Sequence, residues 1–299
     1  MKFSAIALVM FAAFQWGLAG GLGSLLIDRD WDPETMSFWR ALIGLACMVL
    51  WLGVMRLRGR RMTLNRRLVL WSLVAGLGVA GNFAFYFISI SEGSVAVAAT
   101  LMYSAPIFVY LVSFISGAER PTPVKLAAVA LVMAGIVLLT GIYRAEAGAI
   151  TLLGLVSGLL AGLSYALFIF GFKYAGAHGP TPSVLAIAFA AGALVLLPLT
   201  DPGQIVAVTV SPDVVWFVLL GLLGAGLSFY CYITGLRHSL PTAASIVAMV
   251  EPVTATLFGL LVMNDGLRPA QVLGMILILA AVTGLSVMQS RASRETGAL

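Results

Sequence analysis

The sequence predicts an all-α integral membrane protein with ten transmembrane helices arranged as two inverted five-helix repeats. Three observations predict this fold: a succession of long apolar stretches, one repetition of their order, and basic residues gathered in the connectors of one side. Of the 299 residues, 61% are hydrophobic and only 10% are charged, whereas a soluble domain carries about 25% charged residues. A chain this apolar needs lipid around it.

Each apolar stretch is close to the length that crosses the hydrocarbon core, about 20 helical residues. Several stretches begin with a proline near the first helical turn, where a missing amide proton costs nothing. Pairs of acidic and basic residues or Gly-Pro steps mark the connectors. The first stretch follows a single basic residue, has no clear cleavage site and is interpreted as a retained span. In chain order the predicted spans are 3–27, 34–55, 68–90, 94–116, 123–142, 151–173, 182–197, 214–236, 242–263 and 269–288.

The distribution of Lys and Arg predicts the orientation. With a cytoplasmic N-terminus, 13 of the 17 basic residues lie in inside segments and only Arg29, Arg144 and Arg268 lie outside. Such an excess on one side is the positive-inside signal. We therefore expect a multi-pass protein of the bacterial inner membrane with both termini cytoplasmic. Topology also explains the net charge of +5 better than a nucleic-acid partner does.

The two halves of the chain match each other residue by residue. Five spans in each half force opposite orientations, so the repeat is inverted, as in secondary transporters. We expect residues 1–145 to form the first repeat, 146–290 the second, and 291–299 a cytoplasmic tail; the polar segment after Ser290 is expected to be disordered. The matches run at an offset of 149 (Trp16 and Pro33 with Tyr165 and Pro182), 145 (Trp71 and Gly76 with Trp216 and Gly221) and 146 (Ala98, Pro106, Pro123 and Leu131 with Ala244, Pro252, Pro269 and Leu277).

Two charged residues lie inside predicted spans. A carboxylate at membrane depth such as Glu251 is expensive and is a functional site by default; it could contact an ammonium group, carry protons, or only hold a helix break together. Arg40, nearer the outer end of its span, could face the same cavity or extend toward the interface. The repeat pairs Arg40 with Phe189 and Glu251 with Ala105, so each charge is unmatched. We hypothesise that the two charges complement a zwitterion, the alternative being a direct ion pair.

Two prolines, Pro106 and Pro252, stand in the middle of spans four and nine and are expected to kink these helices. The carbonyls left free need partners in protein or in a water-filled cavity, which places both spans beside a cavity. The expected substrate-binding residues are Trp16, Arg40, Asn82, Tyr86, Met102, Tyr103, Tyr165, Tyr230, Ser245, Met249 and Glu251, with Tyr232 a further lining candidate. Spans five and ten have few polar residues and are expected to be peripheral, packing each half or forming a homodimer face.

These features resemble the EamA branch of the drug/metabolite transporter superfamily. The resemblance rests on two five-span halves, Trp16-Gly17, Arg40, the proline spans with their acidic turns, and the Glu251-Pro252 pair. Among its members, bacterial amino-acid exporters of the YddG type are the first comparison. The resemblance implies export of small metabolites through a cavity lined by spans one to four and six to nine. The family usually has Gly-Glu in both acidic turns, whereas this chain has Ala118-Glu119 and Asn264-Asp265.

The function predicted from the sequence is a secondary transporter that exports amino acids or similar small metabolites by alternating access. Its partners would be a small-molecule substrate and the lipid bilayer. The alternatives are a drug or lipid-linked metabolite exporter or flippase, and a membrane scaffold or channel. We expect no enzyme activity, no cofactor and no metal, because nucleotide-binding loops, paired acids and Cys/His clusters are missing from the sequence. Cys47 and Cys231 lie in different spans and indicate neither a disulfide nor a metal site.

The split of basic residues predicts the result of reporter fusions. A reporter fused after Arg61 should be active only if it works in the cytoplasm, and one fused after Asp32 only if it works outside. Activity in the same compartment for both fusions would contradict the inverted repeat.

Overall fold

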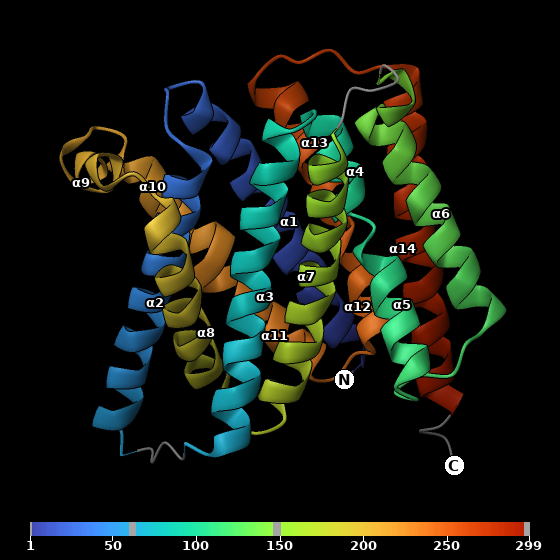
Figure 1. Cartoon of the computed structure of the whole chain (residues 1–299). Coiled ribbons are helices and arrows are strands. Elements are labelled where there is room, and N and C mark those ends of the chain that lie inside the picture. Colours follow the sequence, from blue (N-terminus) through green and yellow to red (C-terminus); the bar gives the residue numbers. More distant parts are fainter. Residues whose placement is uncertain (1, 60–63, 146–150, 296–299) are drawn as a thin grey trace.

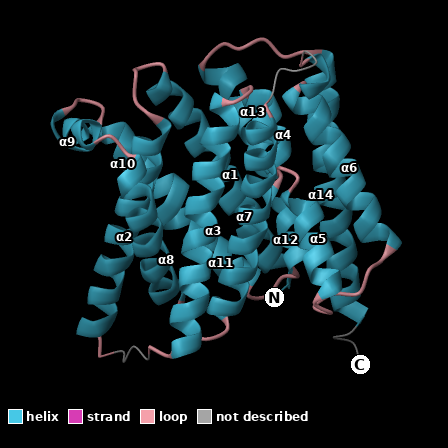
Figure 2. Cartoon of the chain, in the orientation of Figure 1, coloured by secondary structure: helices cyan, strands magenta, loops and turns pink. Residues whose placement is uncertain are grey.

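The fold is a single bundle of long helices running in alternating directions (Figure 1). It comes from a computed structural model that describes residues 2–59, 64–145 and 151–295. Helices and the loops that join them make up this part of the chain, with no strand in it (Figure 2). Ten helical segments of the described chain are long and apolar enough to span a membrane. The all-α fold with ten spans predicted from the sequence is therefore confirmed.

The first half contains five spans, of which the fourth is broken. Side chains cap several helix starts: Asn65 accepts the backbone N–H of Leu68, and Thr122 that of Lys125, which satisfies donors that the first turn leaves free. The elements are α1 (Lys2–Ile27), α2 (Pro33–Leu57), α3 (Arg66–Ser91), α4 (Val95–Met102), α5 (Ala105–Ile115), α6 (Pro123–Thr140) and the short η1 (Ile142–Arg144).

The second half repeats this order with additional irregularities. Its elements are α7 (Leu152–Gly176), α8 (Thr181–Leu196), η2 (Leu197–Leu199), α9 (Pro202–Val210), α10 (Val214–Gly221), the π-helical η3 (Leu222–Gly226), α11 (Leu227–Leu236), α12 (Pro241–Ala248), α13 (Val250–Val262) and α14 (Pro269–Glu295).

Three features of the second half differ from the expectation. The connector between the spans predicted at 182–197 and 214–236 contains a helix, α9. Asp201 accepts the backbone N–H of Gly203 at the start of this helix. Span eight is interrupted by η3, a Gly-rich stretch. The last helix continues to Glu295, so the expectation of disorder after Ser290 is wrong for residues 291–295. Residues 296–299 lie outside the described residues. The repeat boundary, at 146–150, also lies outside them.

Small residues let the two halves interlock closely. Helix α3 of the first half packs against α7 and α8 of the second, and α1 packs against α11 and α13. A Cβ at Gly171 would lie 2.7 Å from the backbone nitrogen of Ala75, and one at Gly78 would lie 2.6 Å from that of Phe168. Helices in lipid associate through such close packing. The core therefore belongs to both repeats at once.

The fifth and tenth spans lie together at one edge of the bundle. Helices α6 and α14 run side by side (Figure 1), and a Cβ at Gly274 would lie 2.6 Å from the carbonyl oxygen of Gly135. The spans expected at the periphery, α6 and α14, are the last spans of the two halves, and they pack against each other. Homodimer formation through this edge stays a prediction.

The start of α1 and the end of α14 lie on one face of the bundle, which we call the terminal face (Figure 1). On the other, the opposite face, the connector after α1 is tied to the start of α10. Asp213 accepts a hydrogen bond from the indole nitrogen of Trp31 (2.9 Å) and forms an ion pair with Arg29. The hydrogen bond from Trp31 and the charge of Arg29 hold the pKa of the Asp213 carboxyl below its usual value.

The close approach of α3 to α8 predicts the effect of a small substitution. A Cβ added at Gly76 would collide with the carbonyl oxygen of Ala188, whereas one at Gly284 meets no atom within 4 Å. Gly76→Ala should lower the thermal unfolding temperature in detergent, because overpacking costs about 1–3 kcal/mol. The control Gly284→Ala should leave it unchanged or raise it. Equal stability of both variants would contradict this packing.

Candidate functional site

A cavity of about 830 Å³ lies between the two halves. Its walls come from α1, α2, α3 and α4 of the first half and from α7, α10, α11 and α13 of the second. Residues of the opposite face form its rim, among them Ile27, Glu34, Val95, Asp265 and Gln271. None of its lining residues comes from a connector of the terminal face within the described chain. The cavity therefore opens toward the opposite face and ends inside the bundle.

Arg40 lies in the wall of this cavity. Its guanidinium carbon is 3.9 Å from the centre of the Phe83 ring, a cation–π contact between α2 and α3. Its side-chain methylenes pass over Gly224 in η3, where a Cβ would lie 2.5 Å from Cδ of Arg40. The π-helical stretch thus makes room for the arginine beneath the membrane surface, and Arg40 faces the cavity instead of extending to the interface.

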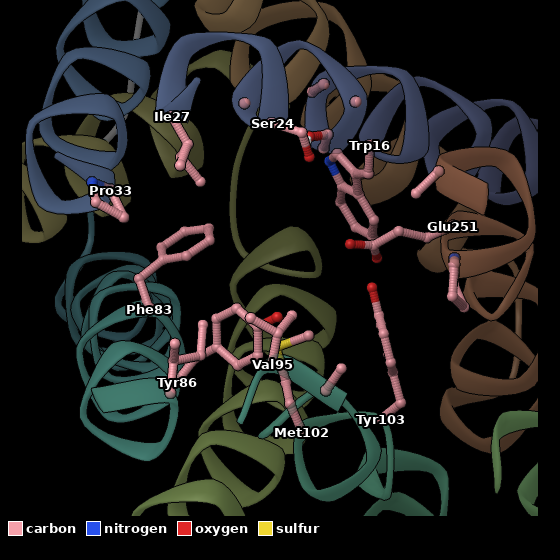
Figure 3. A pocket seen from close by; sticks show the side chains of 18 of the residues that line it. Trp16, Ser24, Ile27, Pro33, Phe83, Tyr86, Val95, Met102, Tyr103 and Glu251 are labelled. Atoms are coloured by element: carbon pink, nitrogen blue, oxygen red, sulfur yellow. Dashed lines mark hydrogen bonds between the residues drawn. The ribbon is translucent and has the colours of Figure 1, made fainter. Parts of the chain in front are cut away.

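Glu251 also lines the cavity, in the first turn of α13. The Tyr165 hydroxyl of α7 donates a hydrogen bond to its Oε2 (3.3 Å). In Figure 3 the hydroxyl of Tyr103 points toward the same carboxylate, and the Trp16 ring lies beside it. Side chains from α1, α7, α13 and the α4–α5 break therefore converge on one carboxylate.

The two charges are not directly paired. The ion pairs among the described residues are Arg29 with Asp213 and Lys125 with Glu119, and no residue in that part of the chain accepts a hydrogen bond from the Arg40 guanidinium. An opposite charge in a low-dielectric cavity attracts across several ångströms, so Arg40 and Glu251 stabilise each other without contact. The space between them is available to a ligand that carries both charges.

The helix breaks lie at the predicted prolines. The fourth span is divided at Tyr103–Ser104, two residues before Pro106, and the ninth at Met249, two residues before Glu251 and three before Pro252. The carbonyl of Leu101 accepts both the hydroxyl (2.6 Å) and the backbone N–H (3.2 Å) of Ser104 at the break. Pro252 lines the cavity, whereas Pro106 is buried beside it. The expected kinks in spans four and nine are therefore present.

Eight of the eleven expected residues line the cavity: Trp16, Arg40, Asn82, Tyr86, Met102, Tyr103, Tyr165 and Glu251. One of them, Asn82, also donates to the carbonyl of Ala161 (3.0 Å), which fixes α3 against α7.

The other three, Ser245, Met249 and Tyr230, do not line this cavity. Ser245, in α12, and Met249, at the break that follows it, are fully buried. In span nine only residues of α13, from Glu251 on, line the cavity. The Tyr230 ring of α11 stacks on Trp51 of α2, with 5.0 Å between the ring centroids, and does not line the cavity. Tyr232 is also buried, packed against Trp16.

Several aromatic residues of the wall were missed, notably Phe83, Phe168 and Phe229. Helical spacing contained a signal for two of them. Phe83 lies three residues before Tyr86, and Phe168 three residues after Tyr165, so each shares a face with a predicted residue. The wall also departs from the expected spans: α8 contributes nothing to this cavity, while Thr140 of α6 and Gln271 of α14 reach its rim.

Comparison with known proteins gives a family match across the chain. The model of the "EamA-like transporter family" matches twice, over residues 3–141 and 152–287. The chain is 26% identical to "Uncharacterized transporter YwfM" of Bacillus subtilis, over 93% of this chain and 92% of that protein. It is 29% identical to an "Uncharacterized transporter" of Archaeoglobus fulgidus, over 67% and 70%. A solved crystal structure has the same fold, with a TM-score of 0.74 at 21% identity, covering 97% of this chain and 98% of that one.

The geometry of the cavity predicts which side chains a reagent reaches. In a variant with Cys47 and Cys231 replaced by alanine, Ser24→Cys should react with a water-soluble thiol reagent applied to the opposite face, because Ser24 lines the cavity near its rim. Ser245→Cys should stay unmodified, because Ser245 is completely buried. The mass shift of each variant after labelling measures its reaction. If Ser245→Cys reacted as fast as Ser24→Cys, the burial of Ser245 in span nine would be contradicted.

Proposed function

The chain belongs to the EamA-like transporter family, and from this premise we propose that it exports amino acids or similar small metabolites across the bacterial inner membrane. The observation that carries this proposal is a single cavity with an arginine on one wall and a glutamate on the other, neither neutralised by the other in an ion pair. A zwitterion offers a carboxylate for Arg40 and an ammonium group for Glu251.

Charge-assisted hydrogen bonds explain why such a ligand would bind at membrane depth. The planar guanidinium of Arg40 fits a carboxylate with two parallel hydrogen bonds. The carboxylate of Glu251 keeps one oxygen on Tyr165 and has further capacity for an ammonium donor. A neutral or singly charged ligand leaves one buried charge without a partner, which costs affinity. Arg40 and Glu251 together, which we call the zwitterion clamp, would therefore select molecules that carry both charges.

Cavity size and lining are consistent with a small organic ligand. A volume of about 830 Å³ lies within the range of roughly 300–1,000 Å³ that small-molecule sites occupy. Aromatic side chains cover much of the wall, including Trp16, Tyr86 and Phe168. They would contact the apolar part of the substrate while the two charges hold its polar end.

The distribution of basic residues supports an orientation that is consistent with the proposed export. The connectors of the terminal face contain most of the Lys and Arg, including the cluster that begins at Arg56, of which Arg60 and Arg61 lie outside the described residues. Under the positive-inside rule the terminal face is cytoplasmic. The cavity then opens to the outside, which is the state in which an exporter releases its substrate. Alternating access requires a second state in which the cavity opens to the terminal face.

Transport by purified protein in proteoliposomes tests the proposal. Arg40→Ala should weaken competition by a free amino acid about tenfold, the loss expected for one charge-assisted hydrogen bond. It should leave the weak binding of the carboxyl-amidated analogue nearly unchanged. Glu251→Gln should show the complementary pattern with the deaminated analogue. Arg144→Ala and Glu92→Gln, which remove the same charges outside the cavity lining, are the matched controls.

A double-mutant cycle that pairs each residue with the matching ligand deletion separates recognition from folding damage. Coupling energies near zero in both cycles, with folded variants, would overturn the zwitterion clamp. Uptake of a drug or lipid-linked metabolite in its place would favour another exporter of the family, and flux that never saturates would favour a channel.

A further inference from the structure

The two acidic turns, one after α5 and one after α13, occupy equivalent places in the two repeats. At the offset of 146, Glu119 corresponds to Asp265. Both turns have the same backbone hydrogen bond: the N–H of Glu119 donates to the carbonyl of Ser113, and that of Asp265 to the carbonyl of Gly259, each at 3.0 Å. The inverted repeat places the first turn on the terminal face and the second on the opposite face.

The side chain of Glu119 crosses from the first half to the second. Its Oε1 accepts the backbone N–H of Thr242 (3.0 Å) and the hydroxyl of Ser113 (3.3 Å), and its Oε2 lies 2.8 Å from Nζ of Lys125. Thr242 is in the first turn of α12, whose N-cap residue, Leu240, provides no side-chain cap. A carboxylate from the other repeat therefore caps this helix, in the place that the helix dipole favours for a negative charge.

The connector before α12 is held from its other side as well. Nζ of Lys173, at the end of α7, donates to the carbonyls of Leu236 (2.8 Å), Arg237 (3.1 Å) and Ser239 (2.6 Å). The start of α12 thus lies between Lys173 and Glu119. The bond between Glu119 and Thr242 joins the two repeats on the terminal side of the cavity, so it has to break before the repeats can separate there, whereas the Lys173 bonds lie within the second repeat.

The equivalent contacts are missing on the opposite face. Asp265 is exposed at the cavity rim and makes no side-chain hydrogen bond or ion pair with any other described residue. The positions of Ser113 and Lys125 are occupied by Gly259 and Gln271 in the second half. Helix α4, the counterpart of α12, is already capped by its own Ser94, which accepts the N–H of Val97 (3.3 Å). Its first turn therefore has less need of a carboxylate from the other repeat.

We propose that Glu119 is a positioning residue for transport, a latch between the repeats that holds the terminal face closed, and that Asp265 does not latch the opposite face. Opening the terminal face removes the cap of α12 and leaves donors of its first turn without a partner. Closing the opposite face makes no equivalent bond. The unequal turns make the state that opens to the opposite face the resting state. This inference rests on the alternating access of the proposed function.

Distances between spin labels on the full-length protein in lipid nanodiscs test the latch. In the variant without Cys47 and Cys231, one label pair at Ser116 and His238 reports the terminal face, and another at Ser91 and Arg268 reports the opposite face; all four positions are exposed. With Glu119 unchanged, we expect one population, in which the label-to-label distance is short at the terminal face and long at the opposite face. Glu119→Ala should raise the population with the reverse distances about tenfold, because a differential contact sets the ratio of two states.

Asp265→Asn is the matched control, since it changes the equivalent carboxylate and should leave both distance distributions unchanged. If Glu119→Ala does not fold, Glu119→Gln carries the test, because it retains an oxygen for the Thr242 amide but loses the charge held by Lys125. Its shift should be in the same direction and smaller. A folded Glu119 variant with unmoved distances, or an equal shift in Asp265→Asn, would overturn the latch. No substrate is added, so failure here is distinguishable from failure of the transport assay.

Discussion

The satisfaction of backbone hydrogen bonds in lipid is the constraint on which the rest of this structure depends. A helix that crosses the hydrocarbon core can be interrupted only where protein or a cavity satisfies the freed groups. The breaks at Tyr103–Ser104 and Met249 and the π-helical stretch at Leu222–Gly226 all lie around the central cavity. The helices at the edge, α6 and α14, are unbroken. The interruptions therefore mark the inside of the bundle, where side chains can reach a ligand.

The repeat explains the scaffold, and departures from it explain the polar chemistry. Matching prolines break spans four and nine at equivalent places, and matching small residues let helices of both halves approach. Yet Arg40 is matched by Phe189, and Glu251 by Ala105. A symmetrical pair of arginines or glutamates in one cavity would repel each other. The positions at which the halves differ bring opposite charges to one cavity, which is the arrangement that the proposed zwitterionic substrate requires.

Capping also differs between the halves, although the backbone turns are the same. Glu119, paired with Lys125 of its own repeat, accepts the backbone N–H of Thr242 in the other repeat, whereas the side chain of Asp265 makes no such bond to a described residue. An inverted repeat with identical side chains would be equally stable open to either face. Under the latch proposal, unequal polar contacts at the two ends give one state the lower free energy, and the preference resides in a few side chains of the two turns.

The sequence alone determined the ten spans, their inverted order and the two breaks, because these depend on local properties: hydrophobic length, proline and the offset between the halves. It also identified Arg40 and Glu251, because a charge in an apolar span is conspicuous without any neighbour. Only the tertiary structure decided which side of each helix faces the cavity. Tyr230 differs from Tyr165 in that respect, whereas Ser245 lies in α12, before the helix break, and is buried. Helix rotation depends on packing against other spans, and a nearly uniformly apolar helix has little periodicity that would reveal it.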